Sequence, residues 1–419
     1  MADWQAGELL RIATAGSVDD GKSTLIGRLL YDSKSVFTDQ LDAIEQTSAN
    51  RGDEYTNLAL LTDGLRAERE QGITIDVAYR YFATPRRTFI VADTPGHVQY
   101  TRNMVTGAST ADVAVVLVDA RNGVVEQSRR HAYLSWLLGV PHIVLAVNKM
   151  DLVDFSESRF NEIAAEFRAF TTTLGRADIE AVPMAALLGD NVVDRSENMP
   201  WYDGPALLGL LEGLELALDH NRTDARFPVQ YVIRPMSTDR PDYRSYAGTV
   251  SSGVFKPGDS VTILPSGRTT TVAGIDQYER ELDQAFAPLS VSIRLADDID
   301  ISRGDMIAAA EDLPTTVSEL HADVCWMVDA PLRAGGRYSI KHTTRSVKAL
   351  VESLHDRINV DTLDREPSDV LNLNDIGRVT FRLAQPLFVD DYINNRGTGS
   401  FIVIDEATKS TVGAGMVRL

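Results

Sequence analysis

Short apolar runs alternate with amphipathic stretches through the first half of the chain. The apolar runs are residues 9–15, 77–82, 88–92, 113–119, 143–148 and 181–186. Their length and apolar character are typical of strands buried on both faces of a sheet. Amphipathic stretches such as 125–138 and 159–170 lie between most of them. The alternation predicts an α/β domain, with a mostly parallel sheet and helices on both faces.

Two local signals refine this domain. Residues 77–82 and 88–92 are joined by a short connection through Pro85, which predicts an antiparallel hairpin at the edge of the sheet. Asp203-Gly204-Pro205 is typical of a helix start, so we expect a last helix from there to about Leu218.

The pattern after Phe227 is that of an all-β protein. Short alternating runs are separated by turn dipeptides such as Ser252-Gly253 and Ser266-Gly267, which predict barrels or sandwiches. The polar stretch 219–226 and the segment Glu311–Pro314 are the expected linkers. The predicted domains are therefore residues 1–220, 227–312 and 316–419.

Composition narrows the class of protein. The 419 residues are 44% hydrophobic and 24% charged, as in ordinary globular proteins, and their net charge of −19 argues against non-specific binding of nucleic acid. No apolar run approaches the ~20 residues of a membrane helix, and no basic segment precedes an apolar one at the N-terminus. With Cys325 as the single cysteine, we expect a cytoplasmic protein without an internal disulfide.

The most specific motif is a phosphate-binding loop. Gly16–Ser23 matches G-x-x-x-x-G-K-[ST] and lies between an apolar strand and the helical stretch 24–31. In such a loop, backbone N–H groups and a helix N-terminus face phosphate oxygens. Lys22 would bridge the β- and γ-phosphates, and the Ser23 hydroxyl would bind Mg²⁺. The strand–helix context disfavours the alternative, a simple glycine turn.

A second motif, Asp93-Thr94-Pro95-Gly96, follows the strand 88–92. A carboxylate at this strand end can reach Mg²⁺ through a water, and the Gly96 N–H can contact the γ-phosphate. Such a sequence alone is usually a turn, but its place after the phosphate-binding loop favours a functional role.

A third motif, Asn148-Lys149-Met150-Asp151, ends the strand 143–147. The Asp151 carboxylate can accept hydrogen bonds from guanine N1–H and from the 2-amino group, which adenine lacks, so it would select guanine. Lys149 would cover the base with its aliphatic stem, and Asn148 would hold the loop. The alternative is a helix N-cap beside a surface lysine.

Two further residues carry weaker signals. Thr74 could give Mg²⁺ a second hydroxyl, although β-branched residues commonly begin strands. His97 directly follows Gly96 and could orient an attacking water.

Together these residues resemble the translation-factor GTPases of the elongation factor Tu and 1-alpha type, and within them the large subunits of sulfate adenylyltransferase. The likeness covers essentially the whole chain. It is carried by Gly16–Thr24, Asp63–Phe82, Asp93–Met104, Met199–Tyr202, Gly248–Asp259, Asp300–Asp305 and Asn395–Asp405.

The resemblance implies a GTP-binding domain followed by two β-barrels. It also implies that Thr74 senses Mg²⁺ and that His97, between the apolar side chains of Val18 and Ile73, orients the water. In that family a separate small subunit makes adenosine 5′-phosphosulfate and pyrophosphate from ATP and sulfate, for sulfate assimilation. The large subunit couples GTP hydrolysis to this reaction, so the implied partner is the small subunit, in heterodimers or in larger assemblies of them.

The predicted site thus combines three sets of residues. Lys22, Thr74 and His97 are catalytic, and Ser23, Thr74 and Asp93 bind the metal. The residues that bind GTP are Gly16, Ser17, Val18, Asp19, Asp20, Gly21, Lys22, Ser23, Thr24, Asp93, Thr94, Pro95, Gly96, His97, Asn148, Lys149, Met150, Asp151, Ala185, Ala186 and Leu187.

The chain departs from the family at Ala185-Ala186-Leu187, where the family has Ser-Ala-Leu. In the family the middle N–H contacts guanine O6, so Ala186 can still make that contact, but a loop-bracing hydroxyl is lost. We expect modestly weaker nucleotide binding and an unchanged preference for guanine.

Two other functions use the same fold. An elongation factor that delivers aminoacyl-tRNA is the first, but its groove should be basic. A GTP-binding scaffold without useful turnover is the second. The chain contains no second phosphate-binding loop, such as the fused adenylylsulfate kinase of several relatives would carry.

Overall fold

The computed structural model describes most of the chain in two compact units. The described residues are 9–34, 44, 46–48, 56, 58–61, 77–95, 101–175, 179–216, 221–234, 243–278, 280–359, 362 and 364–419. The first unit comprises Met1–Ala217 and Val360–Leu363, and the second comprises Leu218–Asn359 and Asp364–Leu419.

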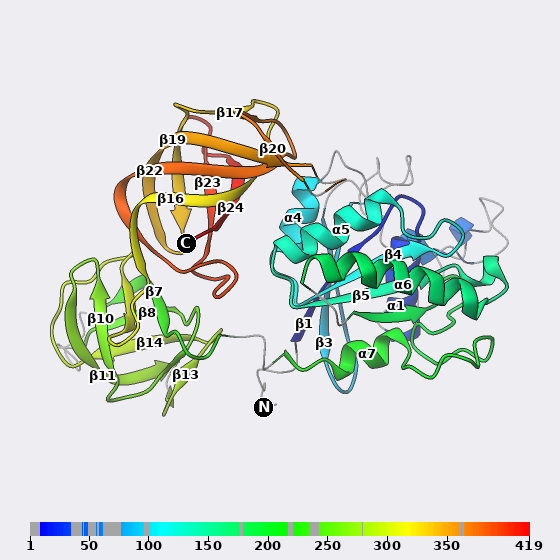
Figure 1. The fold of residues 1–419 in the computed structure, drawn as a ribbon. Coiled ribbons are helices and arrows are strands. Elements are labelled where there is room, and N and C mark those ends of the chain that lie inside the picture. The colour runs from blue at the N-terminus through cyan, green and yellow to red at the C-terminus, as the bar shows by residue number, and fades with distance from the viewer. Residues whose placement is uncertain are drawn as a thin grey trace. The chain divides into compact units, whose positions relative to one another are not determined.

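The first unit is built on a six-stranded sheet in the order β2-β3-β1-β4-β5-β6 (Figure 1). The strands are β1 (Leu9–Ala15), β2 (Ala78–Ala83), β3 (Thr88–Asp93), β4 (Val113–Asp119), β5 (His142–Asn148) and β6 (Glu180–Pro183). Only β2 pairs antiparallel, with β3 at the sheet edge, and the other pairs are parallel. Both the mostly parallel sheet and its edge hairpin are therefore confirmed.

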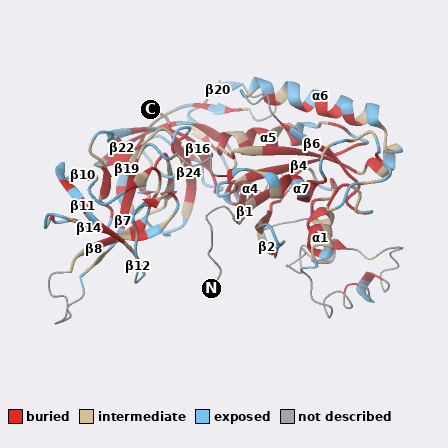
Figure 2. Cartoon of the chain, turned by 90° about the horizontal axis from the view of Figure 1, so that it is seen from below, coloured by how far each residue is buried: buried red, intermediate tan, exposed pale blue. Residues whose placement is uncertain are grey.

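Helices cover this sheet on both faces. They are α1 (Lys22–Asp32), α4 (Thr101–Ala108), α5 (Glu126–Leu137), α6 (Glu157–Thr173) and α7 (Leu207–Gly213), with 3-10 turns η1 (Leu58–Leu61) and η3 (Met150–Val153). Figure 2 shows α5 and α6 above the strands and α1 below them. Every residue of β4 is buried, as two covered faces require.

Two expected boundaries in this unit are wrong. The last helix begins at Leu207 and ends at Gly213, because the N–H groups of Leu207 and Leu208 bond the carbonyls of Asn191 and Val192 in a preceding loop. The strand expected over 181–186 ends at Pro183. There the chain turns, and the Ala185 N–H donates to the Asp190 carbonyl.

The second unit contains two antiparallel barrels. The first has the order β10-β15-β7-β8-β14-β11-β12, and a pairing of β10 with β11 closes it. Its strands, with the small pair β9 and β13, are β7 (Arg226–Ile233), β8 (Ser245–Thr249), β9 (Val254–Phe255), β10 (Ser260–Leu264), β11 (Arg268–Gln277), β12 (Arg280–Glu281), β13 (Ala285–Phe286), β14 (Ser290–Leu295) and β15 (Met306–Ala309).

The second barrel has the order β18-β23-β24-β16-β22-β19-β20 and closes through β18 and β19. Its strands, with the small pair β17 and β21, are β16 (Thr315–Trp326), β17 (Leu332–Arg333), β18 (Arg337–His342), β19 (Arg345–Ile358), β20 (Arg365–Pro367), β21 (Val370–Leu371), β22 (Ile376–Val389), β23 (Ser400–Ile404) and β24 (Thr411–Val417). Closure satisfies the strand edges, and it confirms the prediction of two all-β barrels. None of the described helices is long and apolar enough to cross a membrane.

Candidate nucleotide-binding site

The predicted motifs meet at the carboxyl ends of the parallel strands. The phosphate-binding loop follows β1, Asp93 ends β3, Asn148 ends β5, and the loop with Ala186 follows β6. The crevice beyond these ends is where parallel α/β sheets bind ligands. The fold thus gathers residues that are far apart in the sequence.

The phosphate-binding loop wraps around the ammonium group of Lys22. The Lys22 Nζ donates to the carbonyls of Gly16 at 2.8 Å and Ser17 at 2.9 Å, and the side chain is buried. The Asp20 carboxylate accepts from the Ser17 N–H at 2.5 Å. Gly21 has a left-handed φ of 93°, and a Cβ there would lie 2.5 Å from the Asn148 Nδ2. A side chain at this position would therefore disturb two motifs at once.

Several negative charges lie around this buried lysine. Burial lowers the pKa of Lys22, while the negative charges of Asp93, Asp20 and Asp19 oppose that shift. Burial likewise raises the pKa of Asp20, against the Ser17 hydrogen bond and the Lys22 charge. Because these carboxylates surround a single buried cation, added negative charge on a phosphate would need further compensation from backbone N–H groups or a metal ion.

Asn148 connects the phosphate-binding loop to the loop after β6. Its Nδ2 donates to the Asp20 carbonyl at 2.8 Å, and its Oδ1 accepts from the Ala186 N–H at 2.9 Å. All three residues are buried. The Ala186 N–H thus already has a partner in the protein, so a contact from it to guanine O6 would be shared with Asn148.

Arg28 of α1 braces the same loop from the other side. Its Nε donates to the Ala186 carbonyl at 3.2 Å, and its Nη2 donates to the Leu187 carbonyl. A salt bridge of 3.6 Å to Asp32 orients the guanidinium. These contacts hold the loop although Ala185 has no side-chain hydroxyl.

Lys149 crosses back over the phosphate-binding loop. Its Nζ donates to the Asp19 carbonyl and lies 3.0 Å from the Asp119 Oδ2. Asp151 follows in the first turn of η3 and is half-buried. Asp119, at the carboxyl end of β4, is absent from the predicted site, although a carboxylate ending an apolar strand was a usable signal.

The residues expected to bind Mg²⁺ fit that ion where they are described. Asp93 is buried at the end of β3, and Ser23 is half-buried in the first turn of α1. The described residues contain no cluster of three or more metal-binding side chains. One hydroxyl and one carboxylate suit Mg²⁺, which usually takes few protein ligands alongside phosphate oxygens and waters. Thr94 has a structural contact, since its Oγ1 donates to the Thr14 carbonyl at 2.5 Å.

Three predicted residues lie outside the described part of the chain: Thr74, Gly96 and His97, together with Ile73 beside them. Their roles remain predictions.

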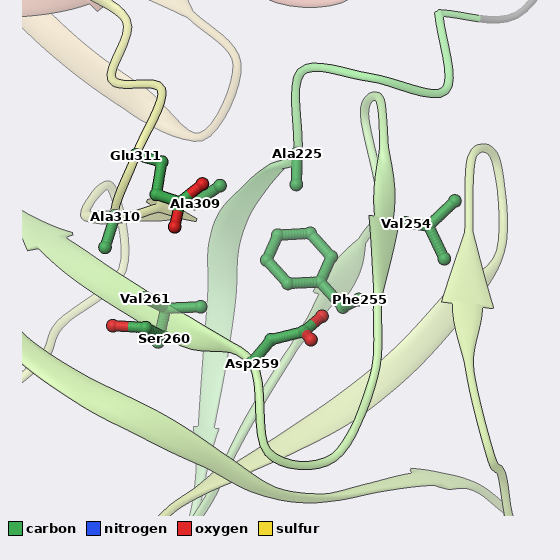
Figure 3. A pocket seen from close by; sticks show the side chains of 9 residues that line it. All are labelled: Ala225, Val254, Phe255, Asp259, Ser260, Val261, Ala309, Ala310 and Glu311. Atoms are coloured by element: carbon green, nitrogen blue, oxygen red, sulfur yellow. The ribbon is translucent and has the colours of Figure 1, made fainter.

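A separate cavity of about 230 Å³ lies in the first barrel (Figure 3). The Phe255 ring lies in the middle of the side chains that line it, and the carboxylates of Asp259 and Glu311 are among them. The Asp259 Oδ2 already caps a turn by accepting from the Lys256 N–H at 2.7 Å. No histidine, cysteine or basic residue lines the cavity.

Comparison with known proteins agrees with this geometry. The family model "Elongation factor Tu GTP binding domain" matches residues 7–224, and "GTP-eEF1A C-terminal domain-like" matches residues 319–418. The chain is 60% identical over 411 residues to the "Bifunctional enzyme CysN/CysC" of Mycobacterium tuberculosis (strain ATCC 25618 / H37Rv), which covers 98% of this chain and 67% of that protein.

Two further relatives are named "Sulfate adenylyltransferase subunit 1". That of Bacteroides fragilis is 52% identical over 412 residues, covering 98% of this chain and 86% of the relative. That of Cellvibrio japonicus is 52% identical over 419 residues, covering 100% of this chain and 88% of the relative.

Proposed function

We propose a function from one premise: the chain belongs to the elongation factor Tu-like GTPases and, among them, to the family of sulfate adenylyltransferase subunit 1. It is the GTP-hydrolysing subunit of that nucleotidyltransferase. GTP hydrolysis drives the formation of adenosine 5′-phosphosulfate and diphosphate from ATP and sulfate. The observation that carries the proposal is that the loops after β1, β5 and β6 converge, with Asn148 bonded to both of the others.

In this proposal each motif has one task. The N–H groups of Gly16–Thr24 and the Lys22 ammonium hold the phosphates, and Asp151 reads the guanine edge. Ser23, Thr74 and Asp93 would hold Mg²⁺, which supplies charge neutralisation on the β- and γ-phosphates. His97, which follows Thr94, Pro95 and Gly96 in the chain, would orient the attacking water.

The switch and the partner extend the same proposal. GTP with Mg²⁺ would order the segment around Thr74 and the loop after Asp93, and hydrolysis would release both. The barrels, residues 227–312 and 316–419, would pass that state from domain 1–220 to a small catalytic subunit in the cytoplasm. The net charge of −19 favours this over delivery of aminoacyl-tRNA, which needs a basic groove.

Copurification with the small subunit tests the proposal. The full chain is expressed with that subunit, and GTP hydrolysis is measured with and without ATP and sulfate. We expect a stable complex whose hydrolysis rises when both substrates are present. A chain that does not bind the small subunit, or that binds tRNA tightly in a GTP-dependent manner by filter binding, would refute it.

A further inference from the structure

Two cations share one buried carboxylate beside the proposed guanine site. Asp119 is 2% exposed and ends β4. Its Oδ1 accepts from the Arg121 N–H at 2.9 Å and from the Arg121 Nε at 3.1 Å, and its Oδ2 accepts from the Arg121 Nη2 at 2.6 Å. The Lys149 Nζ lies 3.0 Å from the same Oδ2.

This carboxylate is ionised throughout the pH range in which the protein would work. Burial alone would raise the pKa of Asp119, but hydrogen bonds from Arg121 and Lys149 outweigh burial and lower it to about 2. Asp119 therefore presents a fixed negative charge to Lys149.

Lys149 needs such an anchor to hold a single position. Its backbone is left-handed with φ 62°, which is uncommon for a residue with a Cβ. Its side chain has several rotatable bonds, whose ordering is costly unless contacts fix the ammonium group. Here the ammonium contacts Asp119 on one side and the Asp19 carbonyl of the phosphate-binding loop on the other. The backbone and the ammonium group of Lys149 are thus both held in place, so the aliphatic stem between them follows one path.

The loop that carries Arg121 is itself anchored. Arg159 of α6 donates from Nε to the Ala120 carbonyl at 2.8 Å and from Nη2 to the Arg121 carbonyl at 3.2 Å. The Ala120 N–H donates to the Asn148 carbonyl at 2.9 Å. Since Asn148 and Lys149 are adjacent, the Asp119 loop and the guanine-selecting motif are fixed to each other through both main chain and side chain.

We propose that Asp119, with Arg121, is a positioning residue of the nucleotide site: it holds the Lys149 ammonium over the phosphate-binding loop, so that the lysine stem lies ready against the base. Arg121 donates to both oxygens of the carboxylate and shares Oδ2 with Lys149. The inference rests on the proposed function, because it assumes a guanine nucleotide in this site. A purely structural Asp119 would instead support the fold without acting through Lys149.

A double-mutant cycle on the full chain separates these roles. The variants are Asp119→Asn, Lys149→Met and the double substitution, and the readout is the dissociation rate of a fluorescent GDP analogue. We expect Asp119→Asn alone to speed dissociation about tenfold, as loss of one charge-assisted hydrogen bond would. In the Lys149→Met background the same change should alter the rate less than about twofold. Equal effects in both backgrounds would overturn the inference.

Two further variants distinguish this role from a general effect on folding. Asp112→Asn makes the same change at the other end of β4, where the carboxylate accepts from the Arg11 N–H at 2.8 Å, and it should leave dissociation unchanged. Arg121→Gln is the safer variant for folding because its side chain is 50% exposed, and it should speed dissociation in a Lys149-dependent way. A dissociation rate that Arg121→Gln leaves unchanged, or changes equally without Lys149, overturns the role of the pair. An unmodified chain that binds no guanine nucleotide overturns both proposals, whereas binding without coupling overturns only this one.

Discussion

Removing the side-chain amide of Asn148 tests whether the convergence of loops creates the nucleotide site. Asn148→Ala deletes a 2.8 Å bond to the Asp20 carbonyl and a 2.9 Å bond from the Ala186 N–H. Both partners are backbone groups of buried residues, and each unsatisfied buried group costs about 1–3 kcal/mol. The two together give roughly 2–6 kcal/mol, and water entering the vacated space favours the lower end. We take about 2 kcal/mol as the part lost from binding, which is a Kd about 30-fold higher.

The assay is equilibrium titration of the full chain with a fluorescent GDP or GTP analogue, alongside thermal unfolding without nucleotide. Asn161→Ala is the matched control, because Asn161 is an exposed residue of α6. The control should leave Kd unchanged. A Kd for Asn148→Ala within about twofold of the unmodified chain would show that the two loops find their positions without this link.

Four other predictions follow from particular residues. Asp151→Asn exchanges an acceptor for a donor, so binding should shift from GTP toward XTP, which carries an oxygen in place of the 2-amino group; competition binding measures this, and retained GTP preference contradicts it. Ala185→Ser should tighten GTP binding a few-fold if the lost hydroxyl matters, and titration showing no change refutes that reasoning. His97→Ala should sharply reduce GTP hydrolysis at nearly constant Kd, and surviving turnover removes His97 from the mechanism. Arg226→Met should destabilise the second unit by roughly 3–5 kcal/mol by taking the arginine partner from Asp390, seen as faster hydrogen exchange across β7; unchanged exchange contradicts it.

Local patterns in the sequence predicted the elements whose signals are themselves local. The strands of the first unit were predicted because each is a short apolar run, and the phosphate-binding loop because glycines, lysine and serine stand at fixed spacing. The same patterns failed at the last helix, where bonds from Leu207 and Leu208 to a distant loop set the start. Tertiary hydrogen bonds override a helix-start signal such as Asp203-Gly204-Pro205.

Contacts between residues far apart in the sequence could not be predicted either, because tertiary packing decides them. Asp119 lies thirty positions before Lys149, and nothing in either segment shows that they form a 3.0 Å ion pair. Whether the Ala186 N–H is available depends on where the Asn148 amide points, which is decided by the packing of three loops. The turn signals predicted barrels or sandwiches without deciding between them, because closure rests on pairings between distant strands, such as β10 with β11 and β18 with β19.

The chemistry of Arg226 determines how the second unit can respond to a nucleotide switch. All five N–H donors of its guanidinium are engaged: Nε and Nη2 with Asp390 at 3.1 and 3.0 Å, Nη2 with the Asp312 carboxylate at 3.1 Å, and Nη1 with the carbonyls of Asp312 and Ala225 at 2.7 and 3.2 Å. Arg226 begins the first barrel, Asp312 lies in the linker, and Asp390 follows β22 of the second barrel. The side chain is 2% exposed, so rotating one barrel against the other would leave a buried cation without its carboxylate partners. That cost, roughly 3–5 kcal/mol, exceeds the 1–3 kcal/mol of a typical allosteric coupling. The two barrels should therefore move as one body, and a signal that reaches either of them reaches both.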